Sequence, residues 1–172
     1  TNAIYFKGNW QLPFDEKYTR DLPFRVSAKT EMKVPTMYQV GEFNYADNQE
    51  IQLLELPYKK SAKQAGLSMV VILPKKDDGL SAVEKQLNTQ LANWLSLVSK
   101  GTKQKVTVYL PKFQLESAFK LKEALAKLGL SEAFDSKKAD FSGITGKKQD
   151  LALSAVVHQA FVDVNEKGTE AA

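Results

Sequence analysis

The sequence predicts an α+β fold, in which antiparallel sheets are combined with a few helices. Short apolar runs rich in β-branched and aromatic residues recur along the chain, whereas apolar residues at helical spacing are confined to residues 81–98 and 121–128. Strands and helices therefore come in separate blocks, which is typical of α+β domains. With 172 residues, of which 43% are hydrophobic, the chain is large enough to form a core.

The first part of the chain is expected to alternate between strands and breaks. Residues 1–9 form a strand-like run, and three prolines interrupt the stretch that follows, at residues 11–37. We expect loops and short edge strands there, since proline cannot donate a hydrogen bond to a neighbouring strand. Three further runs predict an antiparallel meander, at residues 41–46, 51–56 and 67–73.

Helices are expected in the middle of the chain. Ser81 and Glu84 have the spacing of a capping box, so a short helix should begin there. A second helix, at residues 91–98, would end at Gly101. Residues 106–113 return to a strand, residues 121–128 predict a third helix, and a polar loop follows at residues 136–150.

The end of the sequence predicts a long strand that leads into a hinge. Residues 151–164, LALSAVVHQAFVDV, are apolar on both faces, as expected for an interior strand that is covered on both sides. The next residues, NEKGTEAA, include Gly168, which permits backbone angles that other residues avoid, and two alanines with almost no side chain. A buried strand would thus continue into a flexible segment.

Charge and hydropathy argue against nucleic-acid and membrane partners. Lys and Arg exceed Asp and Glu by 24 to 20, but the lysines lie in separated pairs without interleaved aromatics. Such a pattern favours a solvated surface over a nucleic-acid patch, and it leaves a polyanion-binding site open without supporting one. No apolar run approaches the roughly 18 residues of a membrane span.

The residues needed for metal or cofactor chemistry are scarce. There is no cysteine, which excludes disulfides, thiolate catalysis and cysteine-based metal sites. One histidine cannot build a typical zinc site, and no glycine-rich phosphate loop is present. Three acidic residues lie near one another in sequence, but loop and cap roles explain them: Glu132, Asp135 and Asp140. We therefore expect neither a metal nor a cofactor.

His158 and Trp10 each allow a catalytic or ligand-binding interpretation and a structural one. His158 could act as a base toward Ser154 on the same face, but no nucleophile turn surrounds that serine. A buried imidazole hydrogen-bonded to a neighbouring strand is the favoured interpretation. Trp10 could stack on a ligand, yet a tryptophan just beyond a strand is more often a packing residue. Composition alone treats Lys112 and Glu166 as solvated.

Five segments, in order and spacing, resemble the serpins, a family of protease inhibitors that work by changing shape. They are NAIYFKGNW (2–10), LPYKK with LSMVVILP (56–60 and 67–74), VTVYLPKF (106–113), LAKLGLSEAFDSKKADFSGI (125–144) and VVHQAFVDVNEKGTEAA (156–172). The resemblance implies that residues 1–172 are part of a single serpin domain with a partial serpin fold. The helical amino-terminal half, the reactive loop and the carboxy-terminal strands of such a domain are absent from this sequence.

The resemblance also implies a mechanism. A serpin offers its reactive loop to a serine protease, or alternatively a cysteine protease, and the cut loop inserts into the central sheet with the protease trapped. The slot would lie between residues 1–9 and 151–164, and the reactive bond would lie beyond Ala172. The hinge would comprise five residues: Gly168, Thr169, Glu170, Ala171 and Ala172. Their small or uncharged inward side chains favour an inhibitor over a non-inhibitory carrier, chaperone or storage serpin.

Five more residues would control the opening of the sheet according to the resemblance. Asn2 would bond His158, Trp10 would pack at the top of the sheet, and Lys112 would pair with Glu166. The expected partners are the target protease and the remainder of the serpin chain. The protein would be an inhibitor rather than an enzyme, and secreted, with an intracellular location as the alternative.

Overall fold

The structure is a computed structural model that describes residues 5–27, 29–60 and 66–172. The chain divides into two compact units. Unit 1 consists of Thr1–Phe6, Gln114–Val162 and Glu170–Ala172, and unit 2 consists of Lys7–Phe113 and Asp163–Thr169. Mixed helix and antiparallel sheet are present in the described residues, which agrees with the predicted α+β class.

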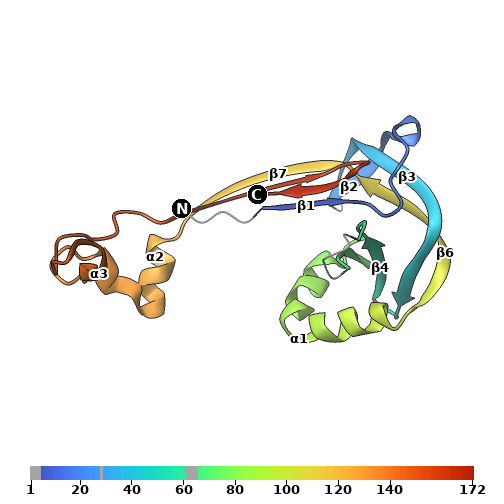
Figure 1. Cartoon of the computed structure of the whole chain (residues 1–172). Coiled ribbons are helices and arrows are strands. Elements are labelled where there is room, and N and C mark those ends of the chain that lie inside the picture. The colour runs from blue at the N-terminus through green and yellow to red at the C-terminus, as the bar shows by residue number, and fades with distance from the viewer. Residues whose placement is uncertain (1–4, 28, 61–65) are drawn as a thin grey trace. The chain divides into compact units, whose positions relative to one another are not determined.

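Unit 2 is built on a five-stranded antiparallel sheet that contains the predicted meander (Figure 1). The strands pair in the order β2-β3-β4-β5, and β6 pairs with the remaining part of β3. Their bounds are β2 Arg20–Ser27, β3 Thr30–Asp47, β4 Ile51–Pro57, β5 Ser68–Pro74 and β6 Thr102–Pro111. The meander prediction is therefore confirmed, with β3 much longer than the run that predicted it.

Residues 11–37 contain the loops and edge strand that were expected, but the strands are longer than the sequence predicted. Apart from a 3-10 turn at Glu16–Tyr18, β2 and the first part of β3 form a long antiparallel hairpin. Pro23 lies in β2, an edge strand, where a missing N–H costs little. Pro35 lies just outside the β3–β6 pairing, which begins at Thr36. Both prolines thus occupy places in a sheet that tolerate them.

A single helix, α1 (Leu80–Ser99), replaces the two helices that the sequence predicted. The apolar residues that pack inward continue at helical spacing through the polar middle: Val83, Leu87, Trp94 and Val98. Ser81 lies inside the helix, and Gly79 occupies the N-cap without a side-chain hydrogen bond, so the capping-box prediction was also wrong. Gly101 follows the helix, near the carbonyl of Tyr45.

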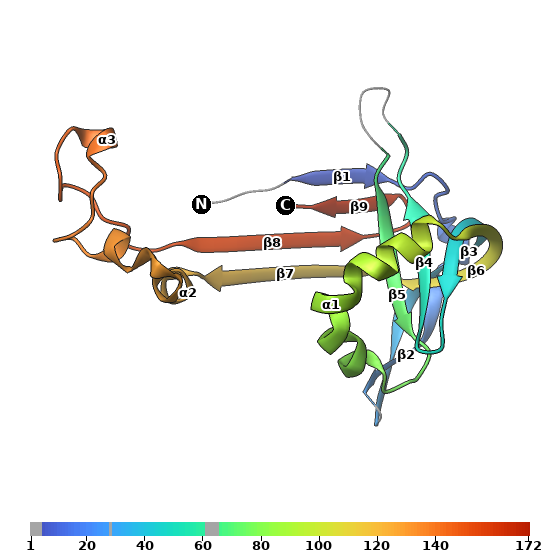
Figure 2. The same cartoon turned by 90° about the horizontal axis from the view of Figure 1, so that it is seen from below.

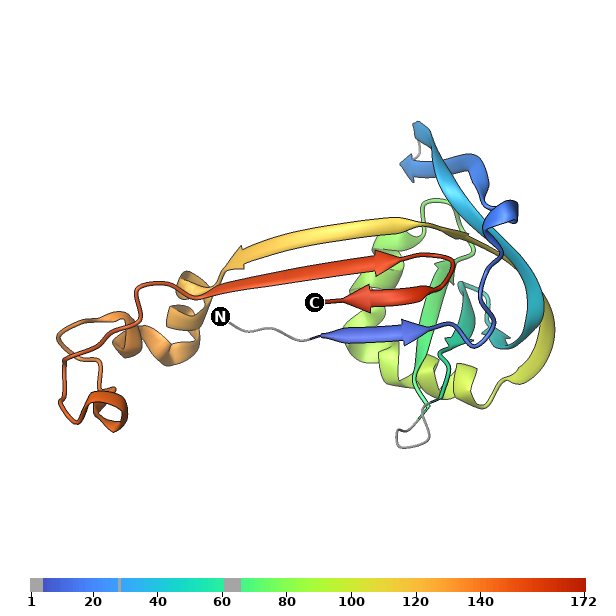
Figure 3. The ribbon, with the colours of Figure 1, turned by 45° about the horizontal axis from the view of Figure 1, so that its top comes forward.

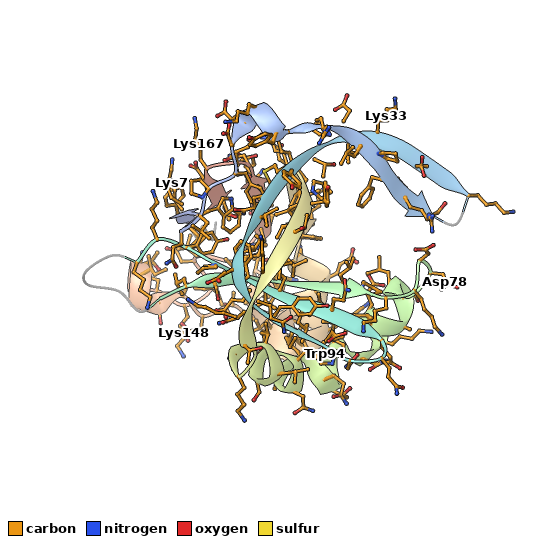
Figure 4. The ribbon with its side chains drawn as sticks, turned by 90° about the vertical axis from the view of Figure 1, so that its right-hand side faces the viewer. Lys7, Lys33, Asp78, Trp94, Lys148 and Lys167 are labelled. Carbon is orange, nitrogen blue, oxygen red and sulfur yellow. The ribbon has the colours of Figure 1, made fainter. Side chains whose placement is uncertain are left out.

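The core of unit 2 lies between α1 and the β4–β5 hairpin. Ile51 and Leu53 of β4 are fully buried and pack with Trp94 of α1, which is labelled in Figure 4. This layer fixes β4, and Tyr58 lies directly after β4. The packing of α1 therefore positions one side of the site described below.

A second sheet has the strand order β1-β9-β8-β7 (Figure 2). The strands are β1 Phe6–Asn9, β7 Phe113–Lys120, β8 Val157–Val164 and β9 Gly168–Ala171. In Figure 3, β9 runs opposite to β1 and β8. The predicted strand at residues 106–113 is in fact the end of β6 and the start of β7, which belong to different sheets.

The long final strand was predicted too long and too buried. β8 begins only at Val157, and residues 151–155 are exposed and outside any strand. Val164 is fully buried, but Leu151 is 43% exposed and Val157 is 40% exposed. Burial on both faces needs a covering layer at each, and the described residues supply one only near Val164. The apolar pattern indicates where such a layer is needed.

The helical part of unit 1 is short and irregular. It comprises α2 Lys122–Leu125, a π-helical turn at Ala126–Leu130, a 3-10 turn at Ser131–Phe134 and α3 Ser142–Thr145. Gly129 has a φ of 101° and interrupts the helix where the sequence predicted its end. Among the described residues, no helix is long and apolar enough to cross a membrane.

The acidic residues of this part have the loop roles that were expected. Asp135 accepts a hydrogen bond from the backbone of Lys137, and Asp140 accepts one from the backbone of Ser142. Hydrogen bonds from Ser142 and Lys148 lower the pKa of Asp140 to about 2. No group of residues suited to hold a metal ion occurs in the described ranges.

The α1 layer makes a testable prediction for unit 2. Leu53→Ala should lower the free energy of unfolding of the protein by about 2–5 kcal/mol, because a fully buried leucine is replaced by a cavity. Leu97→Ala, at a 40% exposed position of α1, is the matched control and should change it by less than about 1 kcal/mol. Urea denaturation monitors both variants. Equal losses in the two would contradict the assigned core.

Candidate functional site: the hinge and its receptor

A tight turn between β8 and β9 leads into the predicted hinge residues. The backbones of Asn165 and Gly168 exchange two hydrogen bonds, of 3.0 and 3.2 Å. The Asn165 side-chain oxygen accepts two more, from the backbone N–H of Lys167 (3.0 Å) and of Gly168 (3.3 Å). An asparagine that bonds the backbone ahead of it is a standard device for closing a turn. This turn reverses the chain, and residues 168–171 after it form β9.

Gly168 is required for close contact rather than for an unusual backbone angle. A Cβ added at Gly168 would lie 2.0 Å from the carbonyl oxygen of Gly8 and 2.9 Å from the Cα of Asn9. Its φ is not in the left-handed region, in which Gly129 and Gly146 are the glycines found among the described residues. The prediction that Gly168 is needed for its freedom of backbone angles is therefore wrong. The structure requires glycine there because another backbone lies too close for a side chain. Strand β1 and the start of β9 touch backbone to backbone.

Trp10 holds the turn by hydrogen bonds to two of its carbonyls. It is 1% exposed, its indole N–H donates to the carbonyl of Asn165 (2.8 Å), and its backbone N–H donates to the carbonyl of Lys167 (2.9 Å). Its ring stacks on Tyr58 with centroids 4.7 Å apart and planes 10° apart. The ring is thus occupied by protein contacts, in agreement with the packing interpretation. The Lys167 side chain itself projects from the surface (Figure 4).

Thr169 is the first hinge residue whose side chain is buried. It is 6% exposed, and its hydroxyl accepts a hydrogen bond of 2.9 Å from the phenol of Tyr58, which is 7% exposed. Burial raises the pKa of the Tyr58 phenol, and the hydrogen bond with Thr169 offsets part of that effect. A small polar side chain from β9 is therefore paired inside the protein.

Glu166 is a buried carboxylate with two side-chain partners. Its side chain is 6% exposed, against 39% for Lys112, whose ammonium lies 2.9 Å from one carboxylate oxygen. The Thr19 hydroxyl donates a 2.8 Å hydrogen bond to the other oxygen. Burial disfavours the charge, but hydrogen bonds from Lys112, from its own backbone N–H and from Thr19 outweigh burial and lower the pKa of Glu166. Composition alone had treated Lys112 and Glu166 as solvated, which is wrong for Glu166.

The remaining hinge residues pair within unit 1. Ala172 and Phe161 of β8 exchange backbone hydrogen bonds of 2.7 and 3.0 Å. Glu170 is half-buried, and its carboxylate accepts a hydrogen bond of 3.0 Å from the hydroxyl of Tyr5. Ala171 is half-buried and ends β9. The hinge is thus held by backbone pairing as well as by its side chains.

The structure gives only part of the predicted pair between His158 and Asn2. His158 lies in β8 and is half-buried rather than buried, and Asn2 lies outside the described residues. Ser154 is exposed and precedes β8, so it does not share a strand with His158. Within the described ranges, the placement of Ser154 and His158 therefore gives no support to the catalytic interpretation.

Three residues of the site were missed in the sequence: Gly8, Thr19 and Tyr58. Tyr58 follows an apolar strand run, a position at which a buried aromatic side chain was foreseeable. Gly8 interrupts a strand, which often marks close approach of another backbone. For Thr19 the sequence carries no signal, because its partner is 147 residues away.

The Glu166 cluster makes a pH-dependent prediction. Because the pKa of Glu166 is lowered in the folded protein, its ionised form stabilises the fold above its unfolded value, about 4.3, and this contribution is lost as the pH falls through the folded value. Glu166→Gln should therefore lower the free energy of unfolding by about 1–3 kcal/mol at pH 7. The difference from the unsubstituted protein should shrink below about pH 4. Thermal unfolding across this pH range measures it.

Glu116→Gln is the control for that measurement, since Glu116 is an exposed carboxylate on β7. It should change stability by less than about 0.5 kcal/mol at pH 7. A Glu166→Gln deficit as large at pH 3 as at pH 7 would contradict the assigned ion pair.

Comparisons with known proteins agree on one family. The serpin family model (serine protease inhibitor) matches residues 1–172. Among curated relatives, human Serpin B9 is 46% identical over 177 residues and the serine protease inhibitor of Cyanea capillata is 42% identical over 174. Each alignment covers 99% of this chain and 45% of the relative, so the chain spans less than half the length of these relatives.

Solved structures show the same relationship. A loop-inserted, cleaved ovalbumin mutant gives a TM-score of 0.81 at 33% identity, covering 97% of this chain and 43% of that one. Cleaved kallistatin complexed with heparin gives 0.80 at 32% identity, covering 97% and 48%. These neighbours have the serpin fold with antiparallel sheets, and this chain corresponds to part of it. The chain belongs to the serpin family.

Proposed function

We propose that this chain supplies the central sheet and the hinge of an inhibitory serpin that traps a serine protease. The protease serine would attack a peptide carbonyl of the reactive loop and form an acyl-enzyme, while the scissile C–N bond breaks and the downstream part of the chain leaves with a new amino terminus. Insertion of the cut loop between β1 and β8 would then carry the protease away before hydrolysis completes. Because the chain spans about 45% of its curated relatives, the activity of the whole protein is a proposal.

The observation that carries the proposal is the position of β9. Hinge residues Gly168–Ala171 form a strand between β1 and β8 in the strand order, where insertion would begin. A loop segment in water has its backbone groups solvated, whereas a strand between two others has them paired and its inward side chains buried. The free energy gained in this exchange would drive the movement.

The side chains of the hinge support the same conclusion. Gly168 has no room for a Cβ, and Thr169 is small and paired. Close-packed interiors reject larger or charged groups at such positions. Several solved neighbours are described as cleaved or loop-inserted, among them Serpin 42Da and ovalbumin. Another neighbour, thyroxine-binding globulin, is described as complexed with a thyroxine derivative and not with a protease. Loop insertion and protease inhibition therefore have to be tested separately.

Relatives named for their targets suggest the protease class. The leukocyte elastase inhibitor of Equus caballus is 43% identical over 178 residues. We take a serine protease as the target class, with a cysteine protease as the alternative. The family includes secreted and intracellular members, so membership does not fix the compartment. The sequence-based expectation was a secreted protein, with an intracellular location as the alternative, and fractionation of the producing cells would decide between the two.

Two measurements on the full-length protein test the proposal. Incubation with a panel of serine and cysteine proteases should give an SDS-resistant complex with a serine protease. Cleavage of the loop by a protease that is not inhibited should raise the melting temperature sharply. A rise without any complex would identify a non-inhibitory serpin that still inserts its loop. Loop cleavage that gives neither a complex nor a rise would overturn the proposal.

Gly168→Ala tests the insertion step itself. The added Cβ would lie within 2.0 Å of the Gly8 carbonyl, so β9 could form only if β1 moved. We expect the ratio of trapped complex to cleaved inhibitor to fall by about tenfold or more, which corresponds to about 1.4 kcal/mol. Gly143→Ala is the matched control, because a Cβ there meets nothing within 4 Å. Retention of full trapping by Gly168→Ala would contradict the contact.

A further inference from the structure

We propose that Tyr58 is a receptor for the hydroxyl of Thr169, and that this contact favours insertion of the hinge over escape of the protease. The inference rests on the proposed function and adds a specificity-determining residue to it. Tyr58 belongs to the body of unit 2, after β4, and Thr169 to the segment that enters. Their sequence separation is 111 residues.

The contact is selective because both partners are buried. The phenol of Tyr58 donates to the hydroxyl oxygen of Thr169 over 2.9 Å, and the two residues are 7% and 6% exposed. In such surroundings the loss of a hydrogen bond destabilises the protein. At the surface, water would replace the lost partner. A threonine or serine at position 169 can accept this bond, and a valine of the same shape cannot.

The receptor is held in place before the hinge arrives. Tyr58 stacks on Trp10, forms a β-bridge with it, and donates its backbone N–H to the carbonyl of Leu67 (2.9 Å). Residue 67 is the last before β5, and β4 and β5 are fixed by the core against α1. The phenol is therefore presented on a rigid part of unit 2. Preorganised groups lose little conformational freedom when they bind.

The stacked pair of Trp10 and Tyr58 also contacts the turn between β8 and β9. Trp10 donates to the carbonyls of Asn165 and Lys167, so it contacts the residues immediately before the hinge, while Tyr58 contacts Thr169. The stacked pair of Trp10 and Tyr58 thus contacts the residues before and after Gly168. An interaction formed only after entry lowers the free energy of the inserted form and not that of the loop outside, so it changes the outcome of the competition.

The experiment compares Tyr58→Phe, Thr169→Val and the double variant in the full-length protein with the inhibited protease. Each single variant should lower the ratio of trapped complex to cleaved inhibitor by about threefold to tenfold. The double variant should lose little more than either single one, because both remove the same bond. Thr169→Ser should restore the ratio, since it keeps the hydroxyl. Tyr109→Phe is the control and should leave it unchanged, because Tyr109 is 55% exposed.

Melting temperatures separate this proposal from the function on which it rests. The melting temperature of the loop-cleaved form should fall in Tyr58→Phe, while that of the intact form stays closer to the unsubstituted value. Equal losses in both forms, or additive losses in the double variant, would overturn the receptor role. If the unsubstituted protein itself gives no complex and no rise on cleavage, the proposed function fails instead.

Discussion

The close approach of the Gly168 backbone to the backbone of Gly8 is the constraint on which the hinge depends. With a distance of 2.0 Å between a hypothetical Cβ and a carbonyl oxygen, no side chain is tolerated where β9 begins. This contact brings the turn against β1 and allows Trp10 to reach two of its carbonyls. It also delivers Thr169 to Tyr58 and Glu166 to Lys112 and Thr19. The polar contacts around the hinge follow from one backbone contact.

Buried polar groups, rather than apolar ones, make the side-chain hydrogen bonds at Glu166 and Thr169. Glu166 and Thr169 are each less than 10% exposed, and each has a specific partner from the sheet of unit 2 or its loops. Paired polar groups contribute little net stability but are costly when mismatched, so they discriminate between correct and incorrect placement. Apolar packing elsewhere in unit 2, between α1 and β4, supplies the rigidity that this discrimination requires.

Part of this organisation could be predicted from the sequence. The meander and a helical segment within residues 121–128 follow from the spacing of apolar residues, and the resemblance to serpins identified the family. Two predicted helices proved to be one, because the polar residues between Val83 and Trp94 do not interrupt the row of apolar side chains that packs against the sheet. Residues 11–37 were expected to contain loops and only short edge strands. The strands are longer, since the tolerance of prolines depends on pairing that the sequence does not reveal. Thr19 could not be predicted, because its partner lies 147 residues away. For Gly8 the only signal was a glycine inside a strand, which does not identify the backbone that approaches it.

The most direct test of the account is hydrogen exchange at the hinge before and after loop cleavage, measured by mass spectrometry on the full-length protein. If β9 forms by insertion, the amides of residues 168–172 and of Phe161 should exchange quickly in the intact protein. After cleavage they should become strongly protected, because residues 168–171 then form a strand between β1 and β8, and Phe161 of β8 pairs with Ala172. Exchange that is equally fast in both forms would contradict the central claim that this segment enters the sheet.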